Sequence, residues 1–293
     1  GRYGMANARS PCGLEIGGNI MGIPLYGQNK QGGKIDDVLI NEKNVWYFDR
    51  PPVLMDDGSL GGAHKLADGT AQDVVLHQYA AGAGSIYGLQ LAASYNGTQA
   101  IDGPSVASTG MNYEGDAADD EGFQWAMSYP GSKGIEGVDS FTVGTAGFYA
   151  KLRFSIEDVS ISDDCAFGFR LKSQASNAAF DNYTDVASLN VISGDIKVES
   201  ILNNATTVTT DTTDNWGDEE SHTLEVRISK AGVASYRLDG RAVTTSPTAD
   251  VTFDTGDVFT PFMFMLHSSG AACDVILQEL ETGVLDDDGN PPS

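Results

Sequence analysis

The sequence lacks the signatures of several enzyme and membrane-protein classes. It contains no GxSxG, HExxH, GxxxxGK[ST] or GxGxxG motif. No apolar run approaches the roughly 18 residues of a membrane-spanning helix. The three cysteines, Cys12, Cys165 and Cys273, are far apart and show no CxxC spacing, which disfavours a disulfide framework.

Basic residues are also scarce. The chain has 17 Lys and Arg against 41 Asp and Glu, a net charge of −24. A surface this acidic repels nucleic acids and anionic membranes, so neither is expected as a partner. The 4 histidines have no neighbours at metal-ligand or catalytic-triad spacing.

The sequence is instead rich in short alternating segments. Residues 222–243, HTLEVRISKAGVASYRLDGRAV, predict two strands joined by a turn, and Asp239-Gly240 then predicts a tight hairpin turn. In CAFGFRLKS, Phe167, Phe169 and Leu171 are expected to face the core, and Arg170 and Lys172 to face outward. Two strongly apolar segments, residues 257–269 and 273–283, predict central strands.

These segments predict an all-β fold. No window supports a long amphipathic helix, and more than ten short strands imply an antiparallel β-sandwich or barrel. Residues 1–43 are irregular and predict an extended N-terminal arm, mildly basic over residues 1–34. Residues 44–283 would form the sandwich, best supported over 120–283. Residues 284–293 predict an acidic, flexible tail.

Three kinds of site are conceivable. Glu279 and Glu281 have the i, i+2 spacing that a glycoside hydrolase could use, but no further carboxylate alternates with them, and an acidic outward face explains the pair equally well. Acidic loops could bind calcium, and loop aromatics could stack on sugars. The residues for calcium are Asp116, Asp119 and Asp120, with Asp211, Asp214 and Asp218 as a second group, and those for glycan contact are Trp125 and Trp216.

The C-terminal half resembles a known domain. The segments DIKVESILNNATTVTTDTTDNWGDEESHTLEVRISKAGVASYRLDG and VTFDTGDVFTPFMFMLHSSGAACDVILQELETG are similar to a concanavalin A-like jelly roll. That domain recurs in structural proteins of tailed bacteriophages, particularly capsid decoration or cement proteins. The resemblance covers about residues 120–283 and is firmest over 194–283.

The resemblance implies a virion structural protein without enzymatic activity or cofactor. Such a protein would be made in the host cytoplasm, lie on the outer capsid surface, self-associate as a dimer or trimer, and bridge subunits of the major capsid protein. Its arm would contact the capsid through Arg2, Tyr3, Arg9, Tyr26, Lys30 and Lys34. The alternatives are a glycan-binding head or tail fibre module, a self-assembling jelly-roll coat protein, and a sandwich glycoside hydrolase.

Overall fold

A computed structural model describes much of the chain from residue 43 onward. The described residues are 43–48, 64–66, 74–79, 89–96, 105–107, 109–113, 118–176, 178–249 and 251–292. All of them belong to one compact unit, residues 40–293. Among them, helical structure is limited to the single 3-10 turns η1 (Val159–Ile161) and η2 (Phe180–Asn182), and no helix could cross a lipid bilayer. The predicted arm lies outside the described residues, apart from Lys43.

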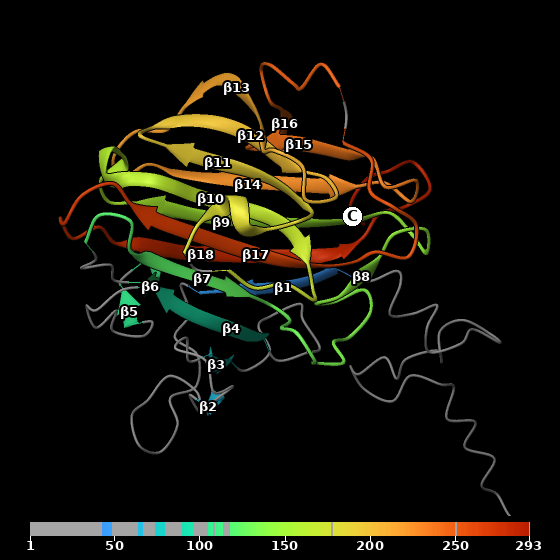
Figure 1. Ribbon diagram of the computed structural model, residues 1–293, viewed down its shortest axis with the longest axis horizontal. Helices are drawn as coiled ribbons and strands as arrows, with labels where there is room; N and C mark the ends of the chain where they lie inside the picture. Colours follow the sequence, from blue (N-terminus) through green and yellow to red (C-terminus); the bar gives the residue numbers. More distant parts are fainter. Residues whose placement is uncertain are drawn as a thin grey trace, which may run out of the picture. The chain divides into compact units, whose positions relative to one another are not determined.

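The strands form two antiparallel sheets packed face to face (Figure 1), which confirms the predicted all-β sandwich. Described strands of the first sheet, sheet A, are in spatial order β16 (Arg241–Ala242), β15 (Ala234–Leu238), β14 (Ser221–Ile228), β9 (Phe148–Ile156), β18 (Val275–Val284), β6 (Gly110–Tyr113) and β5 (Ser105–Ala107), with β1 (Lys43–Tyr47) also paired to β18.

The second sheet, sheet B, is the larger one. Its described strands are in spatial order β13 (Val208–Asn215), β12 (Asp195–Ile201), β11 (Val186–Ile192), β10 (Ser162–Leu171), β17 (Val258–His267), β7 (Gly122–Ala126), β4 (Leu89–Asn96), β3 (Val74–Tyr79) and β2 (His64–Leu66), with β8 (Phe141–Thr142) also paired to β17. The two predicted central strands are β17 and β18, and each has partners on both sides.

Side-chain alternation explains why these segments pair as they do. In β14, Leu224, Val226 and Ile228 are buried between the sheets, and the intervening residues face outward. The predicted hairpin turn is present, because Asp239 and Gly240 both have positive φ, 50° and 78°. Apolar alternation therefore fixes which face of sheet A meets sheet B.

Aromatic side chains fill much of the space between the sheets. Phe141 and Phe148 stack with ring centroids 5.0 Å apart, and Phe169 meets the Phe148 ring edge-on at 5.0 Å. Edge-to-face and offset pairs of this kind add to the free energy gained by burial. The aromatic packing joins β8, β9 and β10, so it links the two sheets directly.

One edge of the sandwich is tied across its two sheets. The segment that follows β16 in sheet A reaches β13, the edge strand of sheet B, where the Thr245 amide donates to the Thr212 carbonyl oxygen at 3.0 Å. Asp214 accepts from the Thr244 amide at 2.8 Å and from Arg241 Nη2 at 2.8 Å. Burial opposes the charge on Asp214, but these donors outweigh it and lower its pKa.

The C-terminal residues lie against sheet A. The Leu285 amide donates to the Gly147 carbonyl oxygen at 2.8 Å, and Arg227 Nη1 donates to the Gly289 carbonyl oxygen at 2.9 Å. Asp286 accepts from the Asn290 amide at 2.7 Å, which closes the tail into a turn. The tail predicted to be flexible therefore makes specific hydrogen bonds in this structure.

Substitution of Gly168 tests the close approach of β10 to β11. A Cβ at this position would lie 2.1 Å from the Ala187 carbonyl oxygen, a backbone atom that cannot swing away. We expect Gly168→Ala to lower the free energy of unfolding by about 2 kcal/mol or more, as overpacking does. The measurement is urea unfolding followed by tryptophan fluorescence.

Gly270→Ala is the matched control for Gly168→Ala. A Cβ at Gly270 would meet no atom within 4 Å, so this variant should unfold at nearly the wild-type urea concentration. Equal midpoints for the two variants would contradict the close approach.

Candidate functional site

A loop covers part of the outer face of sheet B, the face turned away from sheet A. The loop, residues 172–185, joins β10 to β11 and contains η2. Its Phe180 and Tyr183 pack on Phe262 and Phe264 of β17, with ring centroids 5.3–6.0 Å apart. These aromatics belong to a second apolar cluster, separate from the main core. The middle strands of sheet B are thus covered on both faces.

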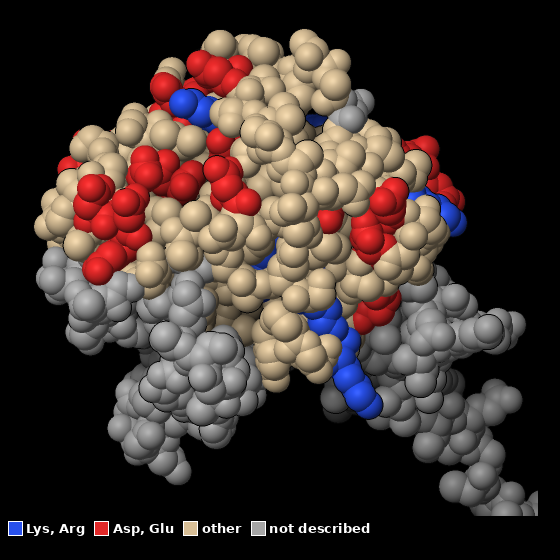
Figure 2. All heavy atoms as spheres, in the orientation of Figure 1, with Lys and Arg blue, Asp and Glu red and all other residues tan. Residues whose placement is uncertain are grey.

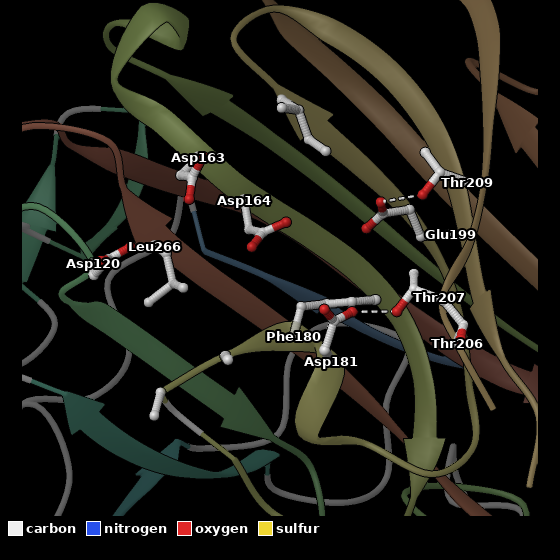
Figure 3. Close-up of a pocket in the computed structure, with 13 residues that line it drawn as sticks. Asp120, Asp163, Asp164, Phe180, Asp181, Glu199, Thr206, Thr207, Thr209 and Leu266 are labelled. Atoms are coloured by element: carbon white, nitrogen blue, oxygen red, sulfur yellow. Dashed lines mark hydrogen bonds between the residues drawn. The ribbon is translucent and has the colours of Figure 1, made fainter. Parts of the chain in front are cut away.

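A hollow of about 500 Å³ lies beside this loop (Figure 3). Residues 178–181 of the loop form one wall, and strands β10, β12 and β13 contribute others. The lining combines carboxylates, hydroxyls and apolar groups, and its described residues include no Lys or Arg. The carboxylates are Asp120, Asp163, Asp164, Asp181 and Glu199, the hydroxyls Thr206, Thr207 and Thr209, and the larger apolar groups Phe180, Ile192 and Leu266.

Two of the carboxylates are held by one amide. Asn190 Nδ2 lies 2.6 Å from Asp164 Oδ1 and 2.7 Å from Glu199 Oε2. The Thr209 hydroxyl donates to the other Glu199 oxygen at 2.8 Å, and the Cys165 amide donates to Asn190 Oδ1 at 2.8 Å. Glu199 is only 6% exposed. The sequence alternation of β10, β11 and β12 places all these polar groups on the outer face of sheet B.

Asp164 differs from an ordinary aspartate in its acidity. Burial raises its pKa from 3.8 to about 7, the Asn190 hydrogen bond opposes the rise, and the nearby carboxylates Glu199, Asp163 and Asp181 add to it. Asp164 therefore carries a proton on a substantial fraction of molecules near neutral pH. A protonated carboxyl can donate as well as accept, which widens the hydrogen bonds the hollow can offer.

The loop wall is tied to the connection between β12 and β13. The Thr207 hydroxyl donates to Asp181 Oδ1, one of the two hydrogen bonds drawn in Figure 3. Asp120, at the end of the hollow nearest β7, donates its amide to the His267 carbonyl oxygen at 2.9 Å. Strands β10, β11, β12, β13 and β17, the loop and the segment before β7 thus all contribute residues around one space.

The structure describes all but one of the residues predicted to bind calcium. Asp119 and Asp120 are exposed, and Asp116 lies outside the described residues. Over the residues that the structure does describe, no three His, Cys, Asp or Glu side chains converge as a metal site requires. In the second predicted group, Asp214 is engaged by Arg241 and Asp218 by the Val159 amide.

The predicted sugar-stacking tryptophans are wrong. Trp125 is 0% exposed and faces Phe167 in the main core, and Trp216 is 2% exposed and packs on Phe154 at 4.6 Å. The Trp216 indole N–H donates to the Glu220 carbonyl oxygen at 3.0 Å. Neither tryptophan is at the surface, because the alternation of β7 turns Trp125 inward and the connection between β13 and β14 packs Trp216 on Phe154.

Glu279 and Glu281 are on the outer face of sheet A, in strand β18, and not beside the hollow. Glu281 is buried and accepts from the Tyr149 hydroxyl at 2.7 Å and from Lys151 Nζ at 3.1 Å. Burial and the neighbouring Glu281 raise the pKa of Tyr149 far above its usual range. Of the two residues predicted as conceivable catalysts, Glu281 is therefore engaged by Tyr149 and Lys151.

The six predicted arm residues, Arg2, Tyr3, Arg9, Tyr26, Lys30 and Lys34, lie outside the described residues, and their role stays a prediction. Acidic side chains outnumber basic ones on the face shown in Figure 2, where they form several separate groups. This distribution agrees with the net charge of −24.

Comparisons with known proteins give a likeness of structure only. No protein-family model and no curated protein matches the sequence. The carbohydrate recognition domain of Emp47p is similar in structure, with 11% identity, a TM-score of 0.43, and coverage of 64% of this chain and 90% of that one. The metal-free carbohydrate recognition domain of Emp46p has 7% identity and a TM-score of 0.42, covering 67% and 89%.

A botulinum neurotoxin serotype D/C binding domain is also similar, with 10% identity and a TM-score of 0.38. That match covers 80% of this chain and half, 50%, of the neurotoxin chain. The low identities and TM-scores mean that these likenesses assign no ligand to the hollow.

The acidity of Asp164 predicts a pH-dependent stability difference. Because its folded-state pKa is raised from 3.8 to about 7, ionisation costs the folded state free energy as pH rises through this window. Relative to wild type, Asp164→Asn should gain up to about 4 kcal/mol in the free energy of unfolding between pH 4 and pH 8. Urea unfolding of both proteins across this range measures it.

Asp163→Asn removes a charge from the exposed neighbouring residue and serves as the control. It should show a much smaller pH-dependent gain than Asp164→Asn. A constant difference between wild type and Asp164→Asn at every pH would contradict the raised pKa of Asp164.

Proposed function

We propose that the protein is a glycan-binding module whose binding site is the hollow on the outer face of sheet B. The observation that carries the proposal is the composition of the hollow, which presents five carboxylates and three threonine hydroxyls together with the apolar side chains of Phe180, Ile192 and Leu266. Sugar hydroxyls are donors that match these acceptors, and the ring C–H groups match the apolar side chains. A volume of about 500 Å³ falls in the ordinary range for small-ligand sites.

The lining also favours one class of glycan. Because no Lys or Arg is among the described residues that line the hollow, a sialylated or sulfated sugar would bring negative charge against these carboxylates without compensation. Neutral sugars avoid this repulsion. The module is therefore proposed to bind neutral glycans.

The predicted capsid role remains a separate prediction. It depends on the arm residues 1–43, and apart from Lys43 these lie outside the described residues. Binding to the major capsid protein, self-association and a place on the virion likewise stay predictions. The glycan-binding alternative is proposed in preference because a specific hollow supports it.

A glycan array compares two matched variants. Ala178 is exposed at the wall of the hollow, so Ala178→Trp should occupy the space and abolish binding of the glycans that wild type retains. Ala231→Trp makes the same change in the exposed turn after β14 and should bind like wild type. Binding by Ala178→Trp, or none by wild type to any neutral glycan, would overturn the proposal.

Hydrolysis is a second candidate, favoured by the Asp164–Glu199 pair. The two oxygens that share Asn190 lie no farther apart than the sum of their hydrogen bonds, about 5.3 Å, which is compatible with the roughly 5–5.5 Å between the carboxyls of retaining glycosidases. The raised pKa of Asp164 suits a general acid, and Glu199 is the second carboxylate that such a mechanism requires.

One assay distinguishes hydrolysis of a bound glycan from binding alone. A glycan retained on the array is incubated with wild type, and reducing ends are counted over time. Release of reducing ends that stops in both Asp164→Asn and Glu199→Gln would establish hydrolysis. An intact glycan after long incubation would leave binding alone.

A further inference from the structure

Arg170 is a fully buried cation without an acidic partner among the described residues. It lies on the outer face of β10, as predicted, but the loop covers it and its exposure is 0%. Its Nη1 donates to the Leu171 carbonyl oxygen at 2.8 Å and to the Gln174 carbonyl oxygen, and its Nε has no hydrogen-bond partner in the part of the chain that the structure describes. The guanidinium carbon lies 6.0 Å from the centre of the Tyr183 ring.

Such a group is costly to bury. Removal from water disfavours the charged form and lowers the pKa of Arg170 to about 10, so the side chain still carries its charge at neutral pH. Backbone carbonyls and an aromatic face compensate only part of the lost hydration. An apolar residue would cover the strand at lower cost, so the specific contact with Gln174 is what distinguishes arginine here.

Gln174 connects the two ends of the loop. Its carbonyl oxygen receives Arg170, its amide donates to the Leu171 carbonyl oxygen at 3.2 Å, and its side-chain Oε1 accepts from the Thr184 amide at 2.8 Å. The Tyr183 hydroxyl, 2.7 Å from the Ser176 carbonyl oxygen and 3.0 Å from Gln124 Oε1, can donate to either. Arg170 of β10 therefore holds the start of the loop at Gln174, and Gln174 in turn holds the end of the loop at Thr184.

This loop is the one that forms a wall of the hollow. Residues 178–181 line the hollow, and they lie between Gln174 and Tyr183 in the chain. We propose that Arg170 is a positioning residue for the glycan site, holding residues 178–181 in place through Gln174 without itself lining the hollow. This inference rests on the proposed glycan-binding function.

Hydrogen exchange and glycan affinity test the inference together in the full chain. In Arg170→Met, amide exchange of residues 174–184 should become at least tenfold faster, while that of β11 and β12 stays at the wild-type rate. The affinity for the array-selected glycan should fall about tenfold. Arg170→Lys keeps the charge but lacks the planar fork that reaches two carbonyls, so it should recover only part of both losses, and it replaces Arg170→Met if that variant fails to fold.

Leu224→Ala controls for general destabilisation, because Leu224 is in the main core of sheet A. It should lower the unfolding temperature but leave loop exchange and glycan affinity unchanged. Unchanged loop exchange in Arg170→Met would overturn the inference, as would faster exchange with unchanged affinity. If wild type binds no glycan, the proposed function fails instead, and the exchange data still decide whether Arg170 holds the loop.

Discussion

Strand β10 is buried on both of its faces, and the rest of the structure is arranged around that burial. Phe167 and Phe169 point into the main core between the sheets, whereas Ala166 on the opposite face belongs to the second apolar cluster beneath the loop. A strand covered on one side only would leave its outer residues solvated. Here the covering loop creates both an interior for Arg170 and a wall for the hollow.

The second cover also changes the chemistry of polar groups. Carboxylates that would be ordinary surface residues on an open sheet lose water contact next to the loop, and the raised pKa of Asp164 is the result. Glu199 is only 6% exposed, and the hydrogen bonds from Asn190 and Thr209 replace the contacts with water that it loses on burial. The hollow thus combines polar groups in a setting that an exposed sheet face does not provide.

Local patterns predicted the sandwich well. The alternation in β14 and the Asp239-Gly240 turn depend on neighbours in sequence, so they could be predicted directly, and β17 and β18 were recognisable by continuous apolar character.

The candidate site could not be predicted from such local patterns. Asp164, Asn190 and Glu199 sit on three consecutive strands, and only the register of β10, β11 and β12 brings them together. Arg170 was correctly placed on the outer face, but the sequence gives no sign that a loop would cover it. Trp125 was misplaced because strand alternation in β7 directs it inward. Trp216 does lie in a loop, between β13 and β14, but that loop packs it on Phe154.

The tie between the segment after β16 and β13 has a consequence for association between molecules. Edge strands with free amides and carbonyls invite pairing with a strand of another chain, which is a route to aggregation. At Thr212 the carbonyl that such a strand would need is already taken by Thr245, and the adjoining Asp214 adds a charge fixed by Arg241. The C-terminal half of β13 is thereby closed to edge-to-edge pairing, and the connection that closes it also prevents the two sheets from separating at this side.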